Sequence, residues 1–145
     1  MKTMCFSVAA LVMTCAALNL GFAGDHPHAI AYEKCSKACS DCQRMCELCA
    51  THCAKQVAAG KKEHLATLKT CQDCATHCSA AASIVARQGP FSALICKACA
   101  DACKRCGDEC EKTKGDGTMK KCAEECRKCE KACRDMLSHD DGHGS

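Results

Sequence analysis

Aromatic and large aliphatic residues are scarce in this sequence. It has no tryptophan, one tyrosine and three phenylalanines among 145 residues. Protein interiors are normally filled at high density by leucine, isoleucine, valine and aromatic side chains, and the sequence has too few of them for such a core. The hydrophobic content of 48% includes 20 cysteines. Cysteine side chains must therefore fill much of the interior.

An excess of charge of one sign is also lacking. The chain has 20 basic and 17 acidic residues, a formal net charge of +3, and the two signs are interspersed along the sequence. Proteins that bind nucleic acids usually present a clustered basic surface, often with aromatic rings on which bases stack. Neither feature is present, so we expect no nucleic-acid partner. The length fits one domain.

Proline is scarce as well, and glycine marks the breaks between longer segments. Breaks occur at Gly60, at Gly89-Pro90 and at residues 115–117, and the segments between them are rich in alanine, lysine, glutamate, arginine and leucine. These residues favour helices. Pro90 suits the start of a helix, and Asp116 or Thr118 is a suitable N-cap. The sequence predicts helices at about residues 29–59, 62–87, 91–113 and 118–138.

Within these segments the cysteines recur at intervals of three and four residues. This is the a/d heptad pattern, which keeps all the side chains on one narrow stripe of each helix. Short connections make sequential helices antiparallel, so the four stripes converge on one axis. We therefore expect an all-α fold, an antiparallel up-down-up-down four-helix bundle with a cysteine-lined core. The stripes consist of Cys35, Cys39, Cys42, Cys46, Cys49, Cys53, Cys71, Cys74, Cys78, Cys96, Cys99, Cys103, Cys106, Cys110, Cys122, Cys126, Cys129 and Cys133.

The first 23 residues have the features of a secretory signal peptide. Lys2 precedes an apolar stretch that ends near residue 20, and Gly21-Phe22-Ala23 is a small-x-small cleavage site. The alternative is a transmembrane helix, but the stretch is short for a bilayer span and polar residues interrupt it. We expect residues 1–23 to be removed with Cys5 and Cys15, leaving 18 cysteines. Residues 24–145 would then form an exported domain, periplasmic or extracellular, with no membrane segment.

Clustered thiols can also form a disulfide scaffold, bind zinc or cadmium, or act as a thiol oxidoreductase. A disulfide scaffold is typical of small cysteine-rich secreted chains, but disulfides need Cβ atoms about 3.5–4.5 Å apart, whereas neighbours on a helix stripe lie about 5–6 Å apart. A zinc or cadmium store would accumulate charge, because four thiolates leave each zinc site at about −2. A thiol oxidoreductase needs one exposed pair of low pKa, and eighteen equivalent positions indicate no such pair.

Copper(I) satisfies the constraints better. It is a soft ion that selects thiolates and accepts two or three ligands. One Cu⁺ for each thiolate cancels the charge, so a long buried column of ions becomes tolerable. Thiols about one helical turn apart could bridge an ion between them, as in the pairs Cys35/Cys39, Cys42/Cys46 and Cys49/Cys53. The pattern thus predicts storage of multiple Cu(I) ions. No nucleophile with a paired base is evident, so we expect a binding protein and not an enzyme.

One end of the expected bundle carries further copper-capable side chains. There the heptad frame reaches His64 and Met119, which lie beside Cys53, Cys110 and Cys122. We expect these two residues to act as metal ligands where copper enters, although a histidine or methionine at such a position often serves packing alone. Replacing both by alanine is expected to slow copper uptake.

The other end of the frame is apolar. We expect a plug formed by Tyr32, Ala81, Ile84, Val85, Phe91, Ile95, Met136 and Leu137. His52 and His77 lie about 100° or more from the cysteine stripe, at about 100° per residue, so they are expected at the surface.

The cysteine ladder of every helix resembles that of the bacterial four-helix-bundle copper storage proteins. The resemblance covers the whole of residues 24–145 and depends on the Cys-x-x-x-Cys and Cys-x-x-Cys spacing. It implies cuprous ions filling the core, no catalytic turnover, and a homotetramer of bundles. The sequence departs from the family in having no twin-arginine export signal, which leaves general secretion as the expected route.

A second copper site depends on where the signal peptide is cut. A chain that begins Gly24-Asp25-His26 offers a free amine, two backbone amides and an imidazole, which together can bind Cu(II) in a square plane. The alternative is a disordered terminus that binds nothing. The histidines of the last residues, 139–143, are expected to have at most weak metal affinity.

Overall fold

The computed structural model describes residues 27–140, and this range is almost entirely helical. Its elements are α1 (Pro27–Ala58), the short 3-10 helix η1 (Lys62–His64), α2 (Leu65–Ala86), α3 (Ser92–Cys110) and α4 (Gly117–Asp140). The all-α prediction is confirmed, although α3 ends at Cys110, three residues before the expected position. The expected signal peptide, the Gly24-Asp25-His26 site and residues 141–145 lie outside the described residues.

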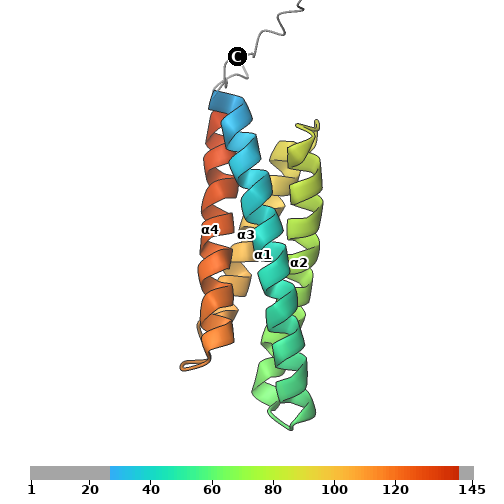
Figure 1. Cartoon of the computed structure of the whole chain (residues 1–145), viewed down its shortest axis with the longest axis vertical. Helices are drawn as coiled ribbons and strands as arrows, with labels where there is room; N and C mark the ends of the chain where they lie inside the picture. Colours follow the sequence, from blue (N-terminus) through green and yellow to red (C-terminus); the bar gives the residue numbers. More distant parts are fainter. Residues whose placement is uncertain (1–26, 141–145) are drawn as a thin grey trace, which may run out of the picture.

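The four helices form the expected antiparallel bundle. Sequential helices run in opposite directions (Figure 1), and each packs on two neighbours, α1 and α3 both contacting α2 and α4. We call the end with the α1–α2 and α3–α4 connections the lower end. The upper end has the start of α1, the α2–α3 connection and the end of α4. The up-down-up-down prediction is confirmed.

Two of the three connections begin with the same hydrogen-bonded turn. After α1, the N–H of Gly60 donates to the Val57 carbonyl and the N–H of Lys61 donates to the Gln56 carbonyl, at 2.9 and 3.0 Å. This is the Schellman arrangement, which requires a left-handed residue just past the helix. Gly60 supplies it with φ 88°, whereas after α2 the same position is filled by Gln88 with φ 50°.

Asp116 begins α4. Its Oδ1 accepts hydrogen bonds from the backbone N–H groups of Thr118 and Met119, at 2.9 and 3.1 Å. The predicted N-cap is therefore Asp116 and not Thr118. The same carboxylate holds His52 of α1 through Oδ2, 2.7 Å from the ring Nε2. This contact ties the α3–α4 connection to α1 at the lower end.

The core consists mainly of sulfur and small side chains. All 18 cysteines of the described range are at most 1% exposed, and alanines make up most of the remaining buried hydrophobic residues. Met119, Met136 and Val85 are the largest side chains that are fully buried. The expected apolar plug at the upper end is wrong for Phe91, which is 63% exposed, because the residue precedes the first turn of α3 and points away from the axis.

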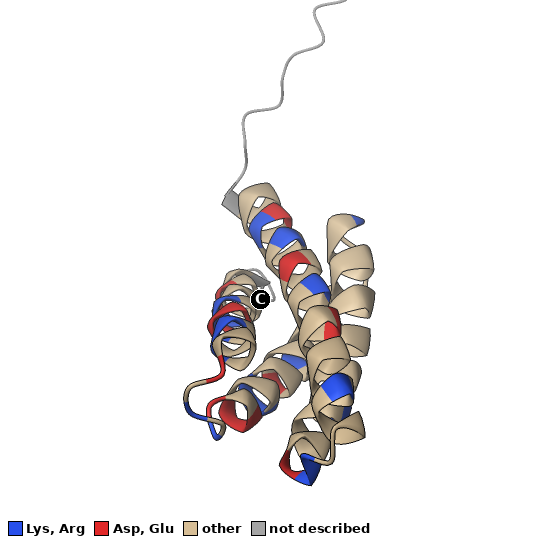
Figure 2. Cartoon of the chain, turned by 60° about the horizontal axis from the view of Figure 1, so that its bottom comes forward, with Lys and Arg blue, Asp and Glu red and all other residues tan. Residues whose placement is uncertain are grey.

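Charged residues of both signs are interspersed along α1 and α4 (Figure 2). Arg127 of α4 joins α3 by donating to the carboxylates of Asp108 and Glu111 and to the Lys104 carbonyl, at 2.6 to 3.1 Å. Within residues 27–140, no helix combines the length and the apolar character needed to cross a membrane.

Candidate metal centre

Every one of the 18 predicted cysteines has its thiol in the bundle core. All are free thiols in the structure, and the shortest Sγ–Sγ contact, between Cys35 and Cys96, is 3.5 Å. The heptad spacing explains this placement, because a residue every three or four positions keeps one helix stripe on the axis. The structure brings the predicted cysteines together into one cluster.

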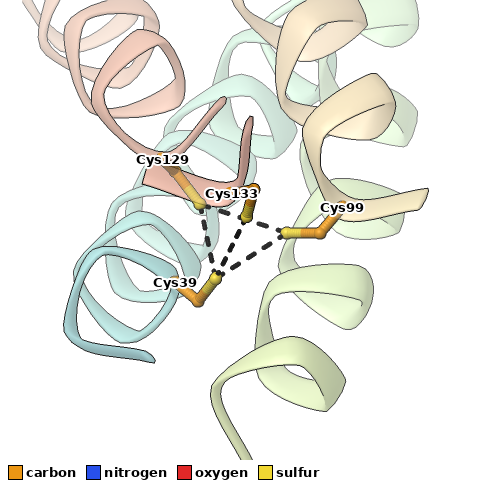
Figure 3. Close-up of side chains that lie close together, drawn as sticks. All are labelled: Cys39, Cys99, Cys129 and Cys133. Carbon is orange, nitrogen blue, oxygen red and sulfur yellow. Dashed lines mark hydrogen bonds between the residues drawn. The ribbon is translucent and has the colours of Figure 1, made fainter. Parts of the chain in front are cut away.

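Most close sulfur contacts cross between helices. Cys42 and Cys46, one of the pairs predicted along a helix, lie 3.9 Å apart. Shorter contacts join different helices, such as the 3.6 Å between Cys39 of α1 and Cys129 of α4 (Figure 3). The backbones of α1 and α3 do not pack on each other, yet their thiols meet across the axis.

Several sets of three sulfurs have all three mutual separations between 3.6 and 4.0 Å. Figure 3 shows one of these sets, formed by Cys39 of α1, Cys99 of α3 and Cys129 of α4, with Cys133 nearby. The sets are Cys39/Cys99/Cys129, Cys42/Cys46/Cys126, Cys74/Cys78/Cys103 and Cys78/Cys99/Cys103. Sets of four, including Cys39/Cys99/Cys129/Cys133, have their sulfurs within 4.8 Å of one another.

These separations are those that a thiolate-bound metal ion requires. With a metal–sulfur bond of about 2.3 Å, as in zinc thiolates, the sulfurs of a planar three-coordinate site lie about 4.0 Å apart. Those of a tetrahedral site lie about 3.8 Å apart by the same geometry. The core can therefore hold thiophilic ions with small side-chain movements and no change of the helix positions.

The sulfur contacts form one continuous path through the bundle. Steps of 4.0 Å or less lead from Cys96 at the upper end through the central cysteines to Cys71 and Cys110 near the lower end. The path also reaches Met136, whose Sδ is 3.7 Å from the Cys96 Sγ. The sequence reasoning placed Met136 in an apolar plug and missed this sulfur contact. Its position three residues after Cys133 continues the cysteine spacing and could have indicated it.

Hydrogen bonds among the thiols, together with burial, raise the pKa of many of these cysteines, whereas such hydrogen bonds lower the pKa of others, such as Cys42 and Cys74. Desolvation raises the pKa of Cys53, and the nearby Asp116 carboxylate raises it further. Hydrogen bonds to Cys129 and Cys133, together with burial, raise the pKa of Cys39. A metal ion that binds here must displace protons from such thiols.

His64 and Met119 lie at the lower end, as predicted, and both are buried. His64 is 5% exposed and Met119 is fully covered. The Nδ1 of His64 is buried and has no hydrogen-bond partner in the described part of the chain, which is unusual because buried polar atoms are generally paired. An imidazole nitrogen in this situation is available to a metal ion.

His52 lies off the cysteine stripe, as predicted, but it is only partly exposed. Its side chain is 27% exposed, and it is held by Asp116, with its ring centroid 6.1 Å from that of His64. The helix angle placed it off the cysteine stripe correctly, but the α3–α4 connection folds over it, and helix periodicity carries no information on that connection. His77 lies on α2, partly exposed, with its Nδ1 3.0 Å from the Asp73 carbonyl oxygen.

Comparison with known proteins identifies relatives of the whole described region. The family model for copper storage proteins (Csp) matches residues 28–138. A cytosolic copper storage protein from Streptomyces lividans, loaded with five coppers, has a TM-score of 0.70 and 31% identity, covering 77% of this chain and 95% of its own. The same organism's protein with 10 copper equivalents covers 76% of this chain and 86% of its own, with the same TM-score and identity.

A copper-free copper storage protein 3 from Bacillus subtilis is also similar, with a TM-score of 0.63 and 32% identity over 72% of this chain and 97% of that one. The curated proteins include no significant match. The family match spans more than half of the chain and coincides with the thiol-filled bundle. The chain therefore belongs to the copper storage protein family.

Proposed function

We propose that this protein stores multiple Cu(I) ions, with the 18 core cysteines as ligands. The observation that carries the proposal is the unbroken set of buried free thiols with separations suited to metal–thiolate bonds. Relatives over the same region are described as loaded with copper or bound to Cu(I). Storage is a binding function, and we infer no catalytic turnover.

The charge of the core favours a monovalent ion. A Cu⁺ ion paired with one thiolate leaves no net charge, whereas a zinc ion with four thiolates leaves about −2 in the interior. No lysine or arginine is among the buried residues of the described range to offset such a charge. Copper(I) is also the softer ion and suits a site made of sulfur alone.

The test is a titration of the reduced protein with Cu(I) in the absence of oxygen, in competition with a chelator. We expect tight binding of many equivalents, on the order of the thiol count, and a parallel titration with Zn²⁺ should bind fewer ions more weakly. Saturation at one or two copper ions would overturn the proposal. Counting free thiols in protein taken from cells tests the disulfide alternative directly.

We infer that copper enters at the lower end, where His64 and Met119 serve as ligands. The Nδ1 of His64, which has no hydrogen-bond partner among residues 27–140, and the fully buried thioether of Met119 support this role. A cavity of about 470 Å³ at the α3–α4 connection is lined by Cys110 and by residues of that connection, and neither His64 nor Met119 lines it. It offers a route from the surface to the lowest thiols.

We further propose that residues 1–23 direct export and are cut after Ala23. The basic start, apolar stretch and small-x-small site support this proposal. Mass spectrometry of protein from the cell envelope should give a chain starting at Gly24, and an intact Met1 in cytosolic protein would refute it. Light scattering of the same material tests the expected tetramer.

A further inference from the structure

The upper end of the bundle holds a soft ligand outside the cysteine set. Met136 of α4 is fully buried, and its Sδ lies 3.7 Å from the Sγ of Cys96. Cys96 in turn lies 3.5 Å from Cys35, which lies 3.7 Å from Cys133. These contacts, 3.5 to 3.7 Å, fall at the short end of the separations in the all-thiol sets in the middle of the core.

The same methionine also borders a surface cavity. A cavity of about 580 Å³ between α1 and α4 is lined by Met136 together with Ile30, Lys34 and His139. The rings of His139 and His28 have centroids 6.4 Å apart. Met136 is thus the side chain that separates this opening from the first thiols of the sulfur path.

We propose that Met136, Cys96 and Cys35 form a terminal Cu(I) site and that this site exchanges copper with the exterior through the α1–α4 cavity. The inference rests on the proposed storage function and adds a second opening, opposite the His64 end. A thioether suits this place because it binds copper(I) without losing a proton and adds no charge. An ion held partly by a neutral ligand is bound less tightly than one among thiolates alone, as exchange requires.

The charge of the cavity indicates the chemical class of the exchange partner. Three lysines, Lys34, Lys128 and Lys131, line it with one carboxylate, Asp135. Lys131 is paired with Asp135 and Lys128 with Glu125, at 2.5 and 2.6 Å, so the excess positive charge of the lining is that of Lys34. Such a lining repels a free cation and attracts an anion. The partner is therefore an anionic Cu(I) complex, such as one formed with a small acidic thiol, and the matching probe is an anionic Cu(I) chelator.

The direct test is spectroscopic. Two full-length proteins are labelled with selenomethionine and loaded with Cu(I), both carrying Met119→Leu and differing only by Met136→Leu. We expect a copper–selenium distance in the selenium-edge X-ray absorption of the protein that keeps residue 136, and its loss in the other. Leucine replaces methionine at similar volume, a change that protein cores usually tolerate, and thermal unfolding verifies that both remain folded.

The second test measures release to the anionic chelator. Met136→Leu should slow release by roughly tenfold, the lower bound for losing a group that supports a metal site. Met45→Leu, at a partly buried methionine packed against the core, should leave the rate unchanged. If the parent protein fails to load copper, the storage proposal fails. If it loads fully but shows no copper–selenium distance, or if release is the same in all variants, only the Met136 site is refuted.

Discussion

At the scale of single residues, the lower end combines a buried imidazole with a buried thioether. The Nδ1 of His64 has no hydrogen-bond partner within the part of the chain that the structure describes, and Met119 is fully covered. We predict that combining His64→Ala with Met119→Leu slows anaerobic Cu(I) uptake by roughly tenfold or more, because the first ligands on the way to the thiols are lost. Stopped-flow transfer from a coloured Cu(I) complex measures the rate. His77→Ala is the control, and equal rates in all three proteins would contradict the prediction.

Asp116 caps α4 and also holds His52, and substitutions can separate these two roles. We predict that Asp116→Ala lowers the free energy of unfolding of the copper-free protein by about 1 kcal/mol, the usual value of an N-cap, while Asp116→Asn retains most of it. Urea unfolding at neutral pH measures both. If Asp116→Asn lowered the free energy of unfolding as much as Asp116→Ala, the N-cap would not be the main contribution of Asp116 to stability.

The pH dependence of unfolding tests what the negative charge of Asp116 contributes to stability. Burial raises its pKa, but hydrogen bonds from the Met119 N–H and from His52 outweigh that effect and place it below the ordinary value. The unfolded state then binds a proton more readily, so the contribution of Asp116 is present above the ordinary carboxyl pKa, about 4, and is lost below it. Asp116→Asn should make unfolding less sensitive to acid in that range, as thermal melts at several pH values would show.

Residue-level prediction succeeded where periodicity alone decides the position. The 18 cysteines are all buried because each continues a heptad stripe. Phe91 was misplaced, and the partial cover over His52 was not foreseen, because their environments depend on the connections. The contact of Met136 with Cys96 depends on how α3 and α4 align, and the spacing within one helix does not specify that alignment.

At the scale of the elements, the two Schellman turns have different residues at the left-handed position. Gly60 adopts φ 88° at no steric cost, whereas Gln88 adopts φ 50°, which is unfavourable for a residue with a Cβ. We predict that Gln88→Gly stabilises the copper-free protein by about 1 kcal/mol and that Gly60→Ala destabilises it by a similar amount. Thermal unfolding measures both. The Gly60 site has no atom within 4 Å of an added Cβ, so a cost there reports the backbone alone.

The helices themselves were predictable, and their ends less so. Alanine-rich and charged segments with regular cysteines predicted all four helices and their antiparallel order. Helix α3 ends at Cys110 because the following residues turn toward Gly115, which has φ 86°, and η1 precedes α2. Such ends depend on local hydrogen bonds between the backbone and the connection, which a heptad pattern does not contain.

At the scale of the whole molecule, the core has few large apolar side chains, so the bound metal should contribute strongly to stability. We predict that copper loading raises the melting temperature markedly, since a ligand at 100 times its Kd adds about 2.7 kcal/mol per site. It should also release about one proton per copper, because protonated thiols become thiolates. Calorimetry and a pH indicator in weak buffer measure the two effects. A four-thiolate zinc site would release close to four protons per ion by the same count.

The unbroken path of sulfurs from Met136 to Cys110 has a consequence for the order in which ions leave. A store with one opening releases its ions in the reverse order of binding, so the ions bound last leave first. A passage open at both ends, with different chemistry at each, can deliver the oldest ions first. Loading with one copper isotope followed by another, and then reading the isotope ratio of the earliest fraction released, would tell which of the two this molecule is.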